Sequence, residues 1–78
     1  MADASQIREH AEVVGSDGQH VGTVDHVDGN SIKLAKRDAS AGGEHHWIPL
    51  SWVESAAETV RLNRTGAQAQ EEWSDSAS

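Results

Sequence analysis

The sequence lacks cysteine, tyrosine and phenylalanine, and it has a single proline. Without cysteine, the chain forms no disulfide, no thiolate zinc site and no cysteine nucleophile. Its 78 residues suffice for one domain. A domain of this size buries only about 60% of the surface of its unfolded chain. We therefore expect a thin core held by packing alone, with homo-oligomer formation as an added source of stability.

Positive charge is scarce. Six Lys and Arg residues oppose thirteen Asp and Glu residues, which gives a formal net charge of -7. Nucleic-acid binding depends on clustered Lys and Arg that neutralise phosphates, and anionic lipid likewise attracts basic segments. We therefore expect neither a nucleic acid nor a membrane as partner, whereas a protein partner is compatible with this charge.

Long apolar runs are also absent. No segment approaches the roughly 20 consecutive apolar residues that span a bilayer. The first ten residues, MADASQIREH, contain acids and lack the apolar centre of a signal peptide. We expect a cytoplasmic protein.

Short apolar segments separated by turn signals predict a β-rich fold. The expected strands are 12–15, 19–27, 31–36, 45–50 and 58–62. The pairs Asp17-Gly18 and Asp28-Gly29 predict tight reversals. The valines of 19–27 recur every third residue, where a regular half-buried strand alternates every second, so we expect a bulge near Gly22. The pattern predicts a small antiparallel β-barrel of about five strands.

Two capping-box patterns predict helix starts. Ser51 and Glu54 indicate a helical turn after the fourth strand, and Thr65 and Gln68 indicate a short C-terminal helix within 64–73. In such a helix Ala69 and Trp73 share one face.

Polar composition at both ends completes the expected organisation. Residues 1–10 form a polar segment, with a helical turn begun by Asp3 or Ser5. Residues 11–63 form the β domain, and 74–78 form a frayed tail.

A family resemblance accompanies this pattern. The run VVGSDGQHVGTVDHVDGNSIKL resembles the first half of a PRC-barrel-like domain, and HHWIPLSWVE and ETVRL resemble its later strands. The residues that carry the first part are Val14, Asp17, Gly18, Val21, Gly22, Val24 and Val27. The resemblance covers roughly residues 11–63 and is strongest to small, single-domain bacterial proteins without assigned function. It implies a PRC-barrel fold.

The resemblance also implies a docking role. Relatives in the photosynthetic reaction-centre H subunit and in a ribosome-maturation factor look like docking modules, although neither specific role transfers by fold alone. The sequence itself shows no nucleophile elbow and no glycine-rich phosphate cradle that leads into a helix. We therefore expect no enzyme activity.

Five histidines are the candidates for a metal site. His45 and His46 are adjacent, so in a strand they point to opposite faces. His20 and His26 lie six residues apart, roughly 20 Å along a regular strand. We expect no metal and no cofactor. A histidine-based metal-binding or pH-responsive protein stays open as the alternative function.

Three tryptophans, Trp47, Trp52 and Trp73, supply all the aromatic area. An exposed tryptophan is an effective interface anchor, whereas a buried one simply fills the core, and both interpretations stay open for each residue. We expect a non-catalytic protein-interaction or adaptor module. Its partner-binding candidates are Trp47, Trp52 and Val53, and the sequence does not identify the partner.

Overall fold

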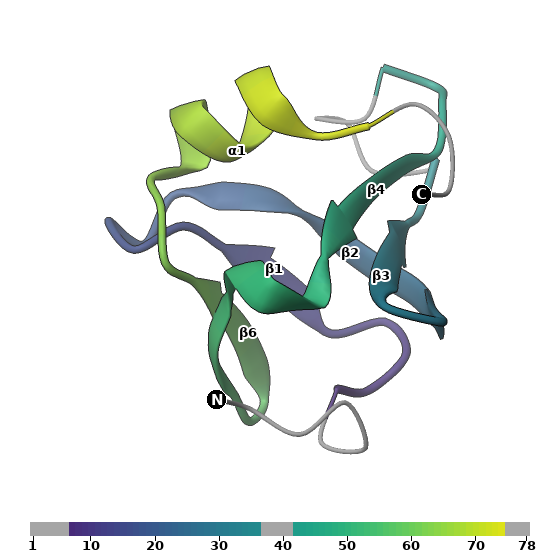
Figure 1. Ribbon diagram of the computed structural model, residues 1–78, viewed down its shortest axis with the longest axis horizontal. Helices are drawn as coiled ribbons and strands as arrows, with labels where there is room; N and C mark the ends of the chain where they lie inside the picture. The colour runs from purple at the N-terminus through teal and green to yellow at the C-terminus, as the bar shows by residue number, and fades with distance from the viewer. Residues whose placement is uncertain (1–6, 37–41, 75–78) are drawn as a thin grey trace.

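A six-stranded sheet and one short helix make up the computed structural model, which describes residues 7–36 and 42–74 (Figure 1). The strands are β1 (Glu12–Val14), β2 (His20–Asp28), β3 (Ser31–Leu34), β4 (His46–Pro49), β5 (Val53–Ala56) and β6 (Thr59–Leu62). A 3-10 helix, Leu50–Trp52, joins β4 to β5, and the α-helix α1 (Gly66–Glu72) follows β6. The helical turn expected at Asp3 or Ser5 lies outside the described residues.

The strand order is β4-β3-β2-β1-β6-β5. All neighbours are antiparallel except β1 and β6, which run parallel. The expected β-rich class is confirmed, but the expected antiparallel barrel of about five strands is wrong, because the six strands form a mixed sheet that is not closed and has β4 and β5 at its edges. These edges are consecutive in the chain and are joined only by Leu50–Trp52. The sheet therefore bends strongly to bring its two ends to one corner.

The predicted capping box at Ser51 and Glu54 does not form. Ser51 lies in the middle of the 3-10 helix, which has no side-chain cap, and Glu54 already belongs to β5. The backbone here is held by a residue distant in the sequence, because Asn63 donates its N–H to the carbonyl of Trp52 at 2.8 Å. The expected helical turn is present as the 3-10 helix Leu50–Trp52, but pairing with β6 makes Val53–Ala56 the strand β5, which the sequence pattern did not reveal.

The irregular valine spacing of β2 reflects bulges, as expected. Val13 pairs with Gly22 but Val14 pairs with His20, so one extra residue, Val21, is accommodated opposite β1. A second register shift follows between Val24 and His26 opposite β3. Because of these two shifts, valines that lie three residues apart can point to the same side of the sheet.

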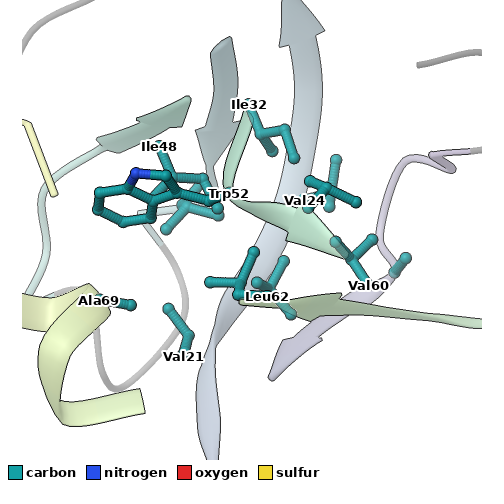
Figure 2. Close-up of a cluster of buried hydrophobic side chains, with 12 residues drawn as sticks. Val21, Val24, Ile32, Ile48, Trp52, Val60, Leu62 and Ala69 are labelled. Carbon is teal, nitrogen blue, oxygen red and sulfur yellow. The ribbon is translucent and has the colours of Figure 1, made fainter. Parts of the chain in front are cut away.

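The core lies on the inner face of the bent sheet (Figure 2). Its fully buried side chains come from five strands and include Val13, Val21, Val24, Ile32, Leu34, Ile48, Val60 and Leu62. The two Asp-Gly reversals are present, and Gly18 and Gly29 take positive φ angles of 82° and 61°. A residue with a Cβ would be strained there.

The capping box at Thr65 and Gln68 is present. The Thr65 hydroxyl accepts the backbone N–H of Gln68 at 3.2 Å, and the Gln68 side chain accepts that of Thr65 at 3.0 Å. Ala69 is fully buried, and Figure 2 places it beside Val21. Ser74, expected at the start of a frayed tail, instead forms an isolated bridge with Trp47. The rest of that expected tail, 75–78, lies outside the described residues.

Candidate functional site

Strand alternation divides β4 between two environments. His46 and Ile48 are buried on the inner face, with exposed fractions of 6% and 0%, whereas Trp47 is half-buried. Trp47 pairs in register with Lys33 of β3. Side chains that alternate along a strand leave its opposite faces, so Trp47 lies on the outer face of the sheet.

Two side chains flank the indole of Trp47. The Nζ atom of Lys33 lies 5.7 Å from the centroid of the ring, within the range of a cation–π interaction. The imidazole of His45 lies 6.3 Å away, centroid to centroid, and is tilted by 52°. The indole Nε1 is shielded from solvent and has no hydrogen-bond partner among residues 7–36 and 42–74. An indole N–H only donates, so Trp47 holds an unsatisfied donor.

A hollow of about 360 Å³ adjoins this indole, and we call it the Trp47 hollow. Its lining residues are Lys36, Gly43, Glu44, His45 and Trp47. His45 is held in place by a 3.0 Å hydrogen bond between its Nδ1 and the carbonyl oxygen of Leu34. Since a carbonyl only accepts, Nδ1 is the donor in this contact.

The other two partner-binding candidates lie in the core. Trp52 is 8% exposed and Val53 is 5% exposed, and Figure 2 shows Trp52 among the buried side chains. The guanidinium of Arg64 covers the ring of Trp52, with Cζ 4.0 Å from its centroid. The 3-10 helix turns Trp52 inward. Between Trp47 and Val53, Trp47 is therefore the aromatic residue that lies on the outer face.

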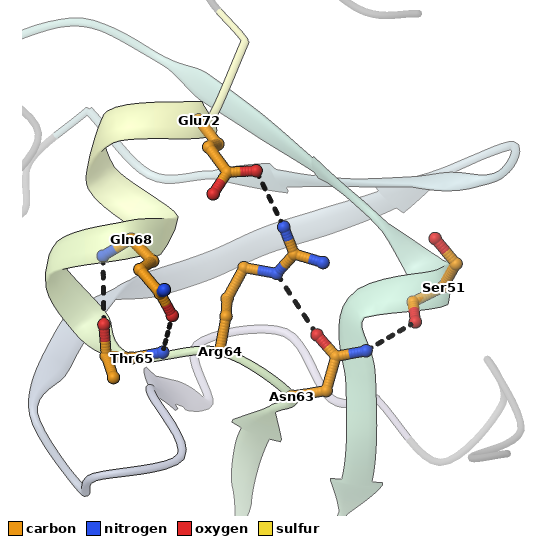
Figure 3. Close-up of polar contacts among 6 residues, drawn as sticks. All are labelled: Ser51, Asn63, Arg64, Thr65, Gln68 and Glu72. Atoms are coloured by element: carbon orange, nitrogen blue, oxygen red, sulfur yellow. Dashed lines mark hydrogen bonds and ion pairs between the residues drawn. The ribbon is translucent and has the colours of Figure 1, made fainter.

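Arg64 belongs to a polar cluster that the sequence did not single out (Figure 3). Its side chain donates to the Asn63 side-chain oxygen at 3.2 Å and pairs with the Glu72 carboxylate at 2.8 Å. Asn63 in turn donates to the carbonyl oxygen of Ser51 at 3.3 Å. These contacts tie the 3-10 helix, the end of β6 and α1 together, which indicates a structural role.

The start of α1 is fastened to the turn between β1 and β2. Asp17 accepts the backbone N–H groups of Gln19 and Gly66, each at 3.2 Å. These hydrogen bonds stabilise the carboxylate and lower the pKa of Asp17 below its usual 3.8. The turn approaches the helix so closely that a Cβ on Gly15 would lie 2.6 Å from the carbonyl carbon of Thr65 and closer still to Gly66 N.

The four candidate metal ligands do not converge. His20 contacts Glu12 at 2.8 Å, and His26 lies 3.5 Å from Asp25. His46 stacks on Trp73 inside the molecule, with ring centroids 4.0 Å apart and planes within 9°. Across residues 7–36 and 42–74, no three His, Asp or Glu side chains gather as a metal-binding group.

One observation bears on the expectation that the protein has no membrane partner. In the described part of the chain, no helix has the length and apolar character that crossing a bilayer requires.

Comparison with known proteins places the chain in a family. Residues 7–70 match the model of the family described as "uncharacterized protein conserved in bacteria" (DUF2171). No curated protein matches the sequence. Since the match covers most of the 78 residues, the chain belongs to this family.

Proposed function

We propose that this bacterial protein is a non-catalytic docking module that binds another protein through the outer face of β3 and β4 around Trp47. The observation that carries the proposal is the indole of Trp47, half-buried on the outer face beside Lys33, with an unsatisfied N–H. Tryptophan dominates the energetics of many interfaces when it sits on a fixed support. The resemblance to PRC-barrel-like docking domains supports the same role by analogy.

The backbone of β4 supplies the fixed support. On one side β4 pairs with β3. On the other side Trp47 donates its N–H to Ser74 at 2.8 Å and accepts the N–H of Ser74 at 2.9 Å. Trp47 is therefore held from both sides, and little conformational entropy is lost when a partner binds it.

The same contacts determine how a partner engages this face. Backbone groups two residues apart in a strand point to the same side, so Pro49 faces the edge that Ser74 occupies at Trp47. Pro49 has no N–H to donate. The backbone groups at the edge of β4 are therefore not free to pair with a strand of the partner. We expect the partner to contact side chains of the outer face instead of extending the sheet.

Site-specific crosslinking in the host bacterium tests this proposal. A photo-reactive amino acid at Glu44, on the rim of the Trp47 hollow, should capture one defined protein, whereas the same group at the exposed Glu71 of α1 should not. The captured protein, once purified, should bind the chain directly, and Trp47→Ala should weaken that binding by more than about tenfold.

Two controls keep this test interpretable. Circular dichroism and thermal unfolding must show that Trp47→Ala is folded. The proposal is wrong if both crosslinker positions capture the same proteins, or if the folded variant binds the purified partner as tightly as the parent chain.

A further inference from the structure

Two basic residues, Lys33 and Lys36, lie close to Trp47 or line the hollow beside it. Of the six Lys and Arg residues, three lie within 33–37, namely Lys33, Lys36 and Arg37. Two of the others serve the fold, because Arg64 pairs with Glu72 and Arg61 donates to the carbonyl of Ser16 at 3.1 Å. In a chain with a net charge of -7, this segment has the densest positive charge in the sequence, and Glu44 is the one carboxylate among the described residues that line the hollow.

The two lysines of this segment, Lys33 and Lys36, are positioned to act on the same small region. Lys36 lines the Trp47 hollow, and the ammonium of Lys33 lies over the adjoining indole at 5.7 Å. Lys33 also approaches Asp25, but at 3.9 Å the contact is long, and both side chains are partly exposed. Such an ion pair contributes little, so Lys33 can exchange Asp25 for another carboxylate at small cost.

The unsatisfied indole N–H is a second and independent sign of a ligand. A shielded donor without an acceptor destabilises the free protein. A carboxylate oxygen would supply the missing acceptor through a charge-assisted hydrogen bond, which is stronger than one to a neutral group. Because Nε1 is shielded in the free protein, one of the flexible side chains at the hollow must move aside when the acceptor enters.

The wall of the Trp47 hollow allows this movement. Gly43 lines the hollow, and both it and Gly42 have positive φ angles with open space where a side chain would stand. The volume of about 360 Å³ is at the small end of the range for ligand pockets. It suits one or two side chains of a peptide better than a large cofactor.

We propose that the Trp47 hollow binds an acidic side chain, Asp or Glu, presented by an extended segment of the protein partner. The carboxylate pairs with the ammonium groups of Lys36 and Lys33 and accepts the indole N–H of Trp47, while a neighbouring apolar side chain covers the indole face. This inference rests on the proposed docking function and specifies the chemistry of the partner.

The experiment uses defined peptides on the full chain. A fluorescein-labelled octapeptide of alternating glutamate and leucine is titrated by fluorescence anisotropy, beside matched peptides in which glutamine or lysine replaces glutamate. The glutamate peptide should bind about tenfold more tightly than the glutamine peptide, and the lysine peptide should not bind. Salt should weaken the binding, because the ion pairs are partly exposed.

Three variants locate the binding. Replacing both lysines, Lys33→Gln with Lys36→Gln, should weaken binding of the glutamate peptide about tenfold. Trp47→Phe keeps an aromatic ring but removes the N–H, and should weaken binding about threefold to tenfold, as the loss of one charged hydrogen bond implies. Arg8→Gln removes a positive charge outside the lining of the hollow and should change affinity less than about twofold.

Each of the following outcomes would reject the proposal of an acidic ligand. The docking function is tested separately, by the crosslinking experiment. Equal binding of the glutamine and glutamate peptides, lost in Trp47→Ala, would keep docking at Trp47 and reject the carboxylate. Tighter binding of an eight-nucleotide oligothymidylate would replace the carboxylate by a phosphate. Equal loss of affinity in Arg8→Gln and in the lysine variant would show that binding depends on the overall charge of the protein and not on the Trp47 hollow. If no peptide binds, the proposal of an acidic ligand is also wrong. The crosslinking experiment would then still test whether the protein is a docking module.

Discussion

Two regions of this molecule treat their polar groups in opposite ways. One region is the helix seam, where Gly15, Asp17 and Arg64–Gly66 join α1 to the sheet. Its close backbone contacts are accompanied by hydrogen bonds that Asp17 accepts and Arg64 donates. At the Trp47 hollow, a shielded indole N–H has no acceptor within the described part of the chain, and glycine forms part of the wall. The seam is complete by itself, which is typical of a structural element. The hollow is incomplete, which is typical of a surface that an external group completes.

The largest expected effect breaks the helix seam. Gly15→Ala places a methyl group against the backbone of Thr65 and Gly66, which no side-chain rotation relieves. We expect a loss of about 3 kcal/mol in the free energy of unfolding, as for overpacking of a rigid site. Urea denaturation measures it. Gly18→Ala is the matched control, because its site has a φ of 82° but open space and should lose only about 1 kcal/mol. Equal losses would show that the backbone of the seam shifts to relieve the close approach, because Gly15 itself has no positive φ.

The same substitution at two tryptophans compares the two regions directly. Trp52→Phe leaves a void in the core and removes the surface that Arg64 covers, so unfolding free energy should fall by about 2 kcal/mol. Trp47→Phe removes an unsatisfied donor, and the free energy of unfolding should rise by up to about 1 kcal/mol. Thermal unfolding of both variants reports the two signs. A clear loss for Trp47→Phe would mean that its N–H already has an acceptor in solution.

Arg64 provides a smaller test of the seam. Arg64→Ala removes both the cation–π contact with Trp52 and the pair with Glu72, and should cost about 1 to 2 kcal/mol. Glu72→Ala removes only the partly exposed ion pair, which should contribute less than about 0.5 kcal/mol. Urea denaturation of the two variants separates these contributions. Equal costs would place the effect in the ion pair and not in the stacking on Trp52.

The smallest effect concerns acid pH. The hydrogen bonds from Gln19 and Gly66 lower the pKa of Asp17 below 3.8 in the folded chain, so the unfolded chain binds the proton more readily. The resulting stabilisation is present above pH 3.8 and is lost as the pH falls through the lowered pKa. Asp17→Asn should therefore flatten the acid limb of the stability profile. Asp28→Asn, in the other Asp-Gly turn, is the control, and equal flattening by both would contradict a specific role for Asp17.

Local signals in the sequence predicted local structure well. The Asp-Gly reversals at Gly18 and Gly29, the capping box of Thr65 and the bulge near Gly22 all depend on residues close in the chain. The inward positions of β3 and β6 followed from alternation for the same reason.

The candidate site was predictable only in part. The sequence named Trp47 but ranked it with Trp52 and Val53, which the 3-10 helix turns into the core. It gave no sign of the unsatisfied N–H or of Lys36 in the lining of the Trp47 hollow, because both depend on where the segments around β4 lie.

The sequence by itself determined the β-rich class, the turn positions and the start of α1, because backbone preference and side-chain alternation act over a few residues. Only the tertiary structure decided that β1 lies parallel to β6, that Val53–Ala56 becomes a strand and that Ser74 closes the edge of β4. Each of these contacts joins segments that no local pattern relates. The burial of Trp52 and the position of Trp47 on the outer face follow from those long-range pairings, since the pairing of a strand sets which face each side chain occupies.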